Sequence, residues 1–117
     1  MKVLVVDDAV GVQWIGEQLE PRGFEVVPAP SLDAAFYLWR TYGPWDLVLT
    51  ELWLVQGQGL KTGLELIRVI RALSPSQRMA LYTADRSILA SPVAVLSKPC
   101  TVNRLLRLLR LPVLPLS

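Results

Sequence analysis

Histidine is absent from this sequence, and cysteine occurs once, as Cys100. Without histidine the chain cannot form a histidine-ligated metal site or a Ser-His-Asp triad, and it cannot carry a phosphoryl group on histidine. A single cysteine cannot form a disulfide within the chain, and this usage fits a reducing compartment. Nothing in the sequence around Cys100 predicts a lowered thiol pKa, so we expect it to be inert.

Long apolar segments and a strong net charge are also missing. No run of about 20 uncharged apolar residues occurs, which is the length that a membrane-spanning helix needs. The apolar run after Lys2 ends at Asp7, which is too short for a signal peptide. The net charge of +2 argues against a nucleic-acid partner. We therefore expect a cytoplasmic protein that does not bind membranes.

What the sequence does contain is enough apolar material for one folded core. The chain has 117 residues, of which 52% are hydrophobic, and this fraction argues against disorder. A domain of this length buries roughly two thirds of its unfolded surface. We expect residues 1–117 to form a single domain, with residues 111–117 as a proline-interrupted C-terminal tail.

Short apolar runs alternate with segments of helical periodicity along the chain. The runs predict five strands, at residues 3–6, 24–27, 47–49, 79–82 and 93–96. Apolar side chains at helical spacing predict the helices between them, and Ser31, Thr62 and Thr101 are candidate N-caps. This alternation is typical of a three-layer, doubly wound α/β fold with a parallel sheet.

Breaker residues limit several of these elements. Gly23 is a C-cap signal after the first helix, and Pro28 and Pro30 are expected to end the second strand. Residues 85–90 can form little more than a turn or two, so we expect a shortened fourth helix. The loop at residues 55–61 contains two glycines, which argues against a regular element there.

Four of the predicted strands are followed by residues that could form a site: Asp7 and Asp8, Glu51, Thr83, and Lys98 with Pro99. In a doubly wound sheet, ligands bind beyond the carboxyl ends of the strands, near the point where strand order reverses. We therefore expect these side chains to meet at one sheet edge. Because three carboxylates would face one ammonium, the pKa of one carboxyl should rise.

These segments resemble those of a response-regulator receiver domain, the CheY-like family of two-component phosphorelay signalling. The resemblance rests on Val3–Asp8, Asp46–Glu51, Gly63, Thr83–Ala84 and Lys98–Pro99, and it covers nearly the whole chain. It implies a flavodoxin-like (βα)5 fold with strand order 2-1-3-4-5. It also implies a partner histidine kinase, which in that family transfers a phosphoryl group, with magnesium, to an aspartate after the third strand.

The resemblance also implies a ligand set for magnesium. Asp8 would bind the ion directly, Asp7 would act through water, and the carbonyl of Trp53 would complete the protein ligands, with Glu51 as a further candidate. Oxygen-rich, partly hydrated coordination is what magnesium prefers. Magnesium is therefore a possible cofactor, although we expect that none is required.

Two more residues would complete a receiver switch. Lys98 would neutralise an acceptor oxygen, and Thr83 would close on the phosphoryl group. Each part of the site also has a simpler interpretation. Thr83 could be a hydroxyl satisfied by the backbone, and Asp7 and Asp8 could be an acidic pair at a helix start, where the helix dipole favours them.

The acceptor position departs from the family pattern. Glu51 stands where the family has aspartate. Its extra methylene misplaces the carboxylate, and a misplacement near 1 Å can cost about a hundredfold in a positioned reaction. Phosphoryl transfer depends on positioning and charge stabilisation, so we expect very poor acceptance. We favour an ion pair between Glu51 and Lys98 over metal binding.

The predicted switch departs from the pattern as well. Val95 occupies the position of the family's switch aromatic, and Tyr82 cannot be assumed to replace it. The stretch from Thr83 to Lys98 is shorter than usual by about two helical turns. The loop after Glu51 is longer than usual. Three of these four departures affect the switch.

The last predicted helix has an apolar arc of about 160°, wider than a core-facing stripe needs. Its interface candidates are Leu105, Leu106, Leu108 and Leu109, and its other face carries Arg104, Arg107 and Arg110. A generous core stripe beside a solvated basic face is one interpretation. We favour a partner or homodimer surface, and Trp53 is a second candidate contact.

The sequence thus predicts a stand-alone, receiver-like signalling domain that is not an enzyme. It would be independent of phosphorylation and would bind a protein partner, either a histidine kinase or a downstream effector. One alternative is a functioning magnesium-dependent receiver that accepts phosphoryl weakly or on another carboxylate. A second is an unrelated enzyme on a flavodoxin-like fold, which we disfavour because no Gly-rich phosphate loop follows the first strand.

Overall fold

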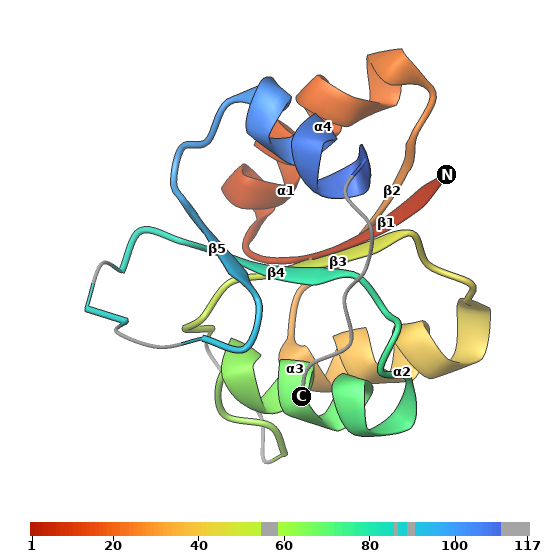
Figure 1. Ribbon diagram of the computed structural model, residues 1–117, viewed down its shortest axis with the longest axis vertical. Coiled ribbons are helices and arrows are strands. Elements are labelled where there is room, and N and C mark those ends of the chain that lie inside the picture. The colour runs from red at the N-terminus through yellow and green to blue at the C-terminus, as the bar shows by residue number, and fades with distance from the viewer. Residues whose placement is uncertain (55–58, 86, 89–90, 111–117) are drawn as a thin grey trace.

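The computed structural model describes residues 1–54, 59–85, 87–88 and 91–110, which form one parallel sheet flanked by helices (Figure 1). The strands are β1 (Lys2–Val6), β2 (Glu25–Ala29), β3 (Leu47–Thr50), β4 (Met79–Thr83) and β5 (Ala94–Ser97). Their order across the sheet is β2-β1-β3-β4-β5, and every neighbouring pair is parallel. This confirms the predicted doubly wound, flavodoxin-like fold.

Helices cover both faces of the sheet, as Figure 1 shows: α1 (Ala9–Leu19) and α4 (Val102–Arg110) lie on one face, and α2 (Leu32–Tyr42) and α3 (Gly63–Leu73) on the other. Successive strand residues point to opposite faces and so feed two cores. Val3 and Val5 pack in the core with residues of α1 and α4, whereas Leu4 and Val6 pack in the core with residues of α2 and α3. Burial on both faces explains the continuous apolar runs.

Local signals in the sequence set several helix ends. Ser31 caps α2 and Thr62 caps α3, because each side chain accepts a hydrogen bond from the backbone N–H three residues later. After α1, a 3₁₀ turn, η1 (Glu20–Arg22), leads to Gly23. The φ angle of Gly23 is 89°, a left-handed conformation that glycine adopts without steric cost. The predicted caps Ser31 and Thr62 are confirmed, whereas the C-cap of α1 is Glu20 and Gly23 ends the 3₁₀ turn that follows.

The second strand was predicted to stop before Pro28, and that prediction was wrong. β2 continues to Ala29, and Pro28 pairs with Val5 in the parallel register. β2 lies at the edge of the sheet, where a strand has only one partner. An edge strand tolerates proline because the missing N–H can face away from that partner.

A shortened helix was predicted between β4 and β5, whereas the described residues of that segment include none. Residues 86, 89 and 90 lie outside the described part, as do residues 55–58 of the long loop and the predicted tail at 111–117. None of the described helices has the length and apolar character to cross a membrane.

The apolar face of α4 is used differently from the prediction. Leu105 and Leu109 are buried in the chain's own core, and Leu106 and Leu108 are partly buried against the same core. The prediction of an interaction surface was therefore wrong for Leu105 and Leu109. The reason is that β3, β4 and β5 present a broad apolar surface on this face, and a wide helical arc is needed to cover it.

Candidate functional site

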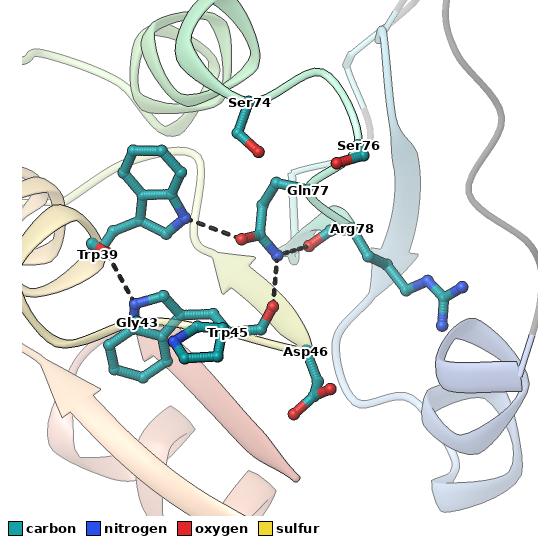
Figure 2. A pocket seen from close by; sticks show the side chains of 9 residues that line it. Trp39, Gly43, Trp45, Asp46, Ser74, Ser76, Gln77 and Arg78 are labelled. Atoms are coloured by element: carbon teal, nitrogen blue, oxygen red, sulfur yellow. Dashed lines mark hydrogen bonds between the residues drawn. The ribbon is translucent and has the colours of Figure 1, made fainter.

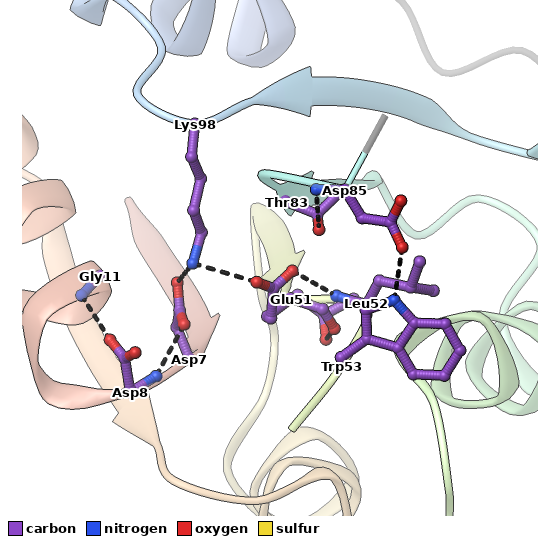
Figure 3. Close-up of polar contacts among 10 residues, drawn as sticks. Asp7, Asp8, Gly11, Glu51, Leu52, Trp53, Thr83, Asp85 and Lys98 are labelled. Carbon is purple, nitrogen blue, oxygen red and sulfur yellow. Dashed lines mark hydrogen bonds and ion pairs between the residues drawn. The ribbon is translucent and has the colours of Figure 1, made fainter. Parts of the chain in front are cut away.

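Four strand ends bring polar side chains to one edge of the sheet (Figure 3). Asp7 follows β1, Glu51 follows β3, Thr83 ends β4 and Lys98 follows β5. Backbone bonds connect these ends, because Glu51 N donates to Val6 O at 2.8 Å and Lys98 N donates to Thr83 O at 3.0 Å. The site is therefore assembled by the register of the parallel sheet.

Lys98 bridges two of the carboxylates. Its Nζ lies 2.6 Å from Asp7 Oδ2 and 3.3 Å from Glu51 Oε1, and 5.1 Å from the ring centroid of Tyr82. The peptide bond to Pro99 is cis. Burial alone would lower the pKa of Lys98, but contact with Asp7 and the charges of both carboxylates outweigh it and raise the pKa. Lys98 is therefore a cation at neutral pH.

Asp7 is the buried partner, with 3% of its side chain exposed. Its Oδ1 accepts a hydrogen bond from Asp8 N at 2.7 Å, whereas Oδ2 meets Lys98 as an ion pair without hydrogen-bond geometry. Burial raises the pKa of Asp7, and Lys98 and the Asp8 N–H only partly offset this. The predicted rise of one carboxyl pKa thus occurs here, but burial causes it more than repulsion by Asp8.

Asp8 does not join the ion pair. Its Oδ1 accepts a hydrogen bond from Gly11 N at 2.9 Å and so caps α1, as in the simpler interpretation of an acidic helix start. Gly11 also makes room for Asp7, because a β-carbon at position 11 would overlap the Asp7 carboxylate. The first turn of α1 therefore holds one aspartate as a cap and leaves space for the other.

Both carboxylate oxygens of Glu51 are engaged. Oε2 accepts a hydrogen bond from Leu52 N at 2.7 Å, and Oε1 faces Lys98. The carbonyl of Glu51 packs against Gly63, where a β-carbon would collide with it. Gly63 N donates to Leu52 O at 2.9 Å. The start of α3 thus fixes the backbone that carries Glu51.

This arrangement of carboxylates does not fit magnesium. Five of the six carboxylate oxygens of Asp7, Asp8 and Glu51 face donors of the chain: two on Asp7, two on Glu51 and one on Asp8. Among the described residues, no three His, Cys, Asp or Glu side chains are grouped closely enough to hold a metal ion. The Lys98 ammonium lies between Asp7 and Glu51 and supplies the positive charge that a cation would bring.

Asp85 is a residue of this site that sequence reasoning missed. Its Oδ2 accepts a hydrogen bond from Trp53 Nε1 at 2.6 Å, and its Oδ1 accepts from Ser87 N at 2.8 Å and from Ser87 Oγ at 2.6 Å. The hydroxyl of Ser87 and the indole of Trp53 lower the pKa of Asp85. An Asp-x-Ser spacing, which is typical of a side-chain-closed turn, could have revealed it.

Thr83 is held by the same segment. Its hydroxyl oxygen accepts a hydrogen bond from Asp85 N at 3.1 Å, and 2% of its surface is exposed. The simpler interpretation of Thr83, a hydroxyl satisfied by the backbone, describes this arrangement. The Thr83 hydroxyl is nevertheless hydrogen-bonded to Asp85, which also accepts a hydrogen bond from Trp53. The bond between Asp85 and Trp53 connects the loop after β4 with the loop after β3.

Tyr82 and Val95 lie on opposite faces of the sheet. Tyr82 packs in the core with residues of α1 and α4 and stacks on Trp14, with ring centroids 6.2 Å apart. Val95 packs against the other core. Burial is the main cause that raises the pKa of Tyr82 to about 12. Because the two side chains lie on opposite faces of the sheet, Tyr82 cannot take the position that Val95 occupies.

A cavity of ≈ 470 Å³ lies at the opposite edge of the sheet, where β3 and β4 begin (Figure 2). Gln77 Oε1 accepts a hydrogen bond from Trp39 Nε1 at 2.9 Å, and Gln77 Nε2 donates to Trp45 O and Arg78 O, each at 3.1 Å. Trp45 Nε1 donates to Trp39 O at 2.9 Å. These polar groups connect parts of the fold and do not resemble the charged site at the other edge.

This chain is similar to known proteins in structure, but no match is found for its sequence. No protein-family model matches the chain, and no curated protein sequence matches it. Solved structures do match. One is the signal receiver domain of an HD domain-containing protein from Pseudomonas fluorescens Pf-5, with 26% identity, a TM-score of 0.79 and coverage of 93% of this chain and 90% of that one.

Two further structures are similar to this chain. A response regulator receiver domain protein from Clostridium thermocellum has 26% identity and a TM-score of 0.73, covering 92% of this chain and 90% of that one. A response regulator from Burkholderia pseudomallei, solved with a phosphorylated aspartic acid, has 28% identity and a TM-score of 0.76, covering 93% of this chain and 66% of that one. This chain therefore has the receiver-domain fold of two-component response regulators.

Proposed function

We propose that this chain is a receiver-like signalling domain that works through protein contacts and without a phosphorylation cycle. The observation that carries the proposal is the state of Glu51. It follows β3, and both of its carboxylate oxygens are engaged, one by Lys98 and one by Leu52 N–H. The receiver fold supports the signalling role, and the engaged carboxylate supports independence from phosphorylation.

Geometry and charge both favour this function. The carboxylate of Glu51 curls back onto the N–H of the next residue, so it is not presented as a free nucleophile. Phosphoryl transfer requires an in-line acceptor and cations that neutralise the developing charge. Lys98 is already shared between Asp7 and Glu51, and the carboxylates are not grouped for a metal within the described part of the chain.

The proposed partner is a protein, either a histidine kinase or a downstream effector, and the proposed location is the cytoplasm. No catalytic role is proposed, because the side chains at the strand ends hold one another and none is set up as a nucleophile beside a base. The site then provides a fixed arrangement of charge that a partner surface can recognise.

Treatment with acetyl phosphate and magnesium, followed by intact-protein mass spectrometry, tests the proposal. The expected result is no gain of about 80 Da, the mass of one phosphoryl group. Glu51→Gln is the matched variant. An addition in the natural sequence that disappears in Glu51→Gln would show a functioning receiver, and an addition that persists would show an acceptor on another carboxylate. Either addition overturns the proposal.

A further inference from the structure

A closed series of contacts links residues of the charged site, and Figure 3 draws most of them. Each residue of the series contacts the next, in the order Lys98, Glu51, Leu52, Trp53, Asp85 and Thr83. Each step is an ion pair, a hydrogen bond or a peptide bond, and the last step returns from Thr83 O to Lys98 N at 3.0 Å. We call this series the rim circuit. It joins the ends of β3, β4 and β5 through side chains as well as through the sheet.

Trp53 is the exposed member of the rim circuit. Its relative exposure is 60%, although it is a large aromatic residue. Its indole N–H donates a hydrogen bond to Asp85 Oδ2 at 2.6 Å, and this bond favours one orientation of the ring. An exposed tryptophan whose orientation is already favoured by a hydrogen bond loses less conformational entropy when a partner binds, and tryptophan is enriched among the residues that dominate binding energy.

The orientation of Trp53 depends on Glu51 from one side. Leu52 is the residue between them, and its N–H is bound to Glu51 Oε2 at 2.7 Å. The ion pair with Lys98 keeps the Glu51 carboxylate in this position. If the ion pair is lost, the carboxylate can move away from the Leu52 N–H. The backbone that carries Trp53 would then turn.

The orientation of Trp53 depends on Thr83 from the other side. The side chain of Asp85 accepts a hydrogen bond from the indole N–H, and the backbone N–H of Asp85 donates a hydrogen bond to Thr83 Oγ1 at 3.1 Å. Hydrogen bonds from Ser87 fix the second oxygen of Asp85. The acceptor that holds the indole is therefore anchored to the end of β4.

We propose that Trp53 is the output residue of this chain, an anchor for a protein partner whose orientation is set by Asp85 and by the ion pair between Glu51 and Lys98. The proposal rests on the proposed function and deepens it. Position 95 is a valine and not an aromatic residue. The exposed aromatic residue beside the charged site is Trp53, in the loop after β3. The matching partner surface offers an apolar pocket for the indole with a basic side chain beside it for Asp85.

Proton NMR of the tryptophan indole N–H groups in ¹⁵N-labelled protein tests the local part. Asp85→Ala removes the acceptor, so solvent exchange of the Trp53 indole proton should become roughly tenfold faster. Gln77→Leu is the matched control, because it removes the acceptor of the Trp39 indole at the other edge and leaves Trp53 unchanged. Unchanged Trp53 exchange in Asp85→Ala would overturn the proposal.

The coupling to the charged site is tested by Glu51→Gln, which removes the charge that attracts Lys98 and keeps the side-chain shape. The Trp53 indole resonance should shift and its exchange should quicken by about threefold, although Asp85 is intact. Trp39 should not respond. If Lys98→Met folds, it should shift Trp53 in the same direction. A Trp53 resonance in Glu51→Gln that coincides with that of the natural sequence would refute the coupling.

These measurements use no phosphoryl donor, so they are independent of the test of the proposed function. A chain that gains phosphoryl mass would overturn that function whatever Trp53 does. A chain that gains no mass and shows no coupling would keep the proposed function and lose Trp53 as its output.

Discussion

Different chemistry joins neighbouring segments of the chain at the two edges of the sheet. At the carboxyl edge, Lys98 holds the charged side chains of Asp7 and Glu51. At the amino edge, the neutral amide of Gln77 joins Trp39 and Trp45. Figures 2 and 3 show the two arrangements. The contacts of Lys98 at one edge are therefore ion pairs, and those of Gln77 at the other edge are hydrogen bonds between groups that do not titrate.

This difference suggests a structural role for the contacts at the amino edge and a functional role for those at the carboxyl edge. The hydrogen bonds of Gln77 at the amino edge involve no titrating group, so we expect them to resist changes in pH and to hold segments of the fold together, although Asp46 and Arg78 also line the cavity there. The carboxyl edge places a buried carboxylate against a lysine, and such a pair loses much more stability when one partner is removed than the pair itself contributes. An edge of this kind is sensitive to its surroundings, as a signalling site has to be.

The largest effect is expected when the cation is removed from the carboxyl edge. Lys98→Met should lower the free energy of unfolding by about 2–4 kcal/mol at pH 7, because Asp7 is left buried and unpaired. The loss should shrink as the pH falls, since protonated Asp7 is neutral. Urea unfolding at several pH values checks both statements. Lys98→Arg keeps the charge and should lose less, and equal losses in both variants would contradict the argument.

Removal of the neutral connection at the amino edge should cost less. Gln77→Leu deletes three hydrogen bonds and leaves the Trp39 indole N–H and two carbonyls without that partner, so we expect a loss of about 1–3 kcal/mol. Unlike the loss in Lys98→Met, this one should not vary with pH. Ser76→Ala, which changes another residue of the same cavity, is the control and should be nearly neutral. A marked pH dependence for Gln77→Leu would erase the proposed difference between the edges.

Two glycines of α1 allow a matched pair of substitutions. A β-carbon at Gly11 would overlap the buried Asp7 carboxylate, whereas one at Gly16 would meet only the end of the Glu20 side chain. Gly11→Ala should therefore destabilise by about 1–2 kcal/mol, in the range of overpacking. Gly16→Ala should change stability little or raise it by up to about 1 kcal/mol, through helix propensity. Thermal unfolding of both variants measures the contrast, and equal effects would show that Asp7 can move aside.

The smallest effect is the pH dependence carried by single carboxyls at the carboxyl edge. The pKa of Asp7 is raised above its ordinary value of 3.8, so the folded state binds this proton more tightly than the unfolded state does. Its contribution is complete below pH 3.8 and is lost as the pH rises through the raised pKa. Asp7→Asn should remove this downward slope from a plot of melting temperature against pH.

Asp85 should give the opposite slope. Its pKa is lowered from 3.8, so its contribution is present above pH 3.8 and is lost as the pH falls through the lowered pKa. Asp85→Asn should flatten the acid side of the same plot. Slopes of the same sign for the two aspartates would contradict the assigned environments.

Much of the fold was predictable because local patterns agreed with one another. Apolar runs located the five strands, and Ser31, Thr62 and Gly23 marked helix ends through bonds or backbone angles that form within a few residues. Pro28 was misjudged because a proline's effect on a strand depends on whether that strand lies at the sheet edge. The leucines of α4 were misjudged for a similar reason, since the width of the surface they cover is set by distant strands.

The candidate site divides in the same way. The sequence indicated which residues would follow the strands, and therefore which would meet at the carboxyl edge. It could not show that Asp8 turns to cap α1, that Asp7 is buried, or that Trp53 reaches Asp85 across 32 positions of the chain. Each of these depends on directions and distances between segments that are far apart in sequence.

The sequence by itself determined the alternation of strands and helices, the glutamate that follows the third strand and the lysine that could face it. Hydrophobic periodicity and residue identity are local properties, and they suffice for those conclusions. Only the tertiary structure decided that Lys98 lies between Asp7 and Glu51 and that the rim circuit closes through Trp53. The physical reason is that ion pairs and hydrogen bonds depend on ångström distances, which the packing of the whole sheet sets.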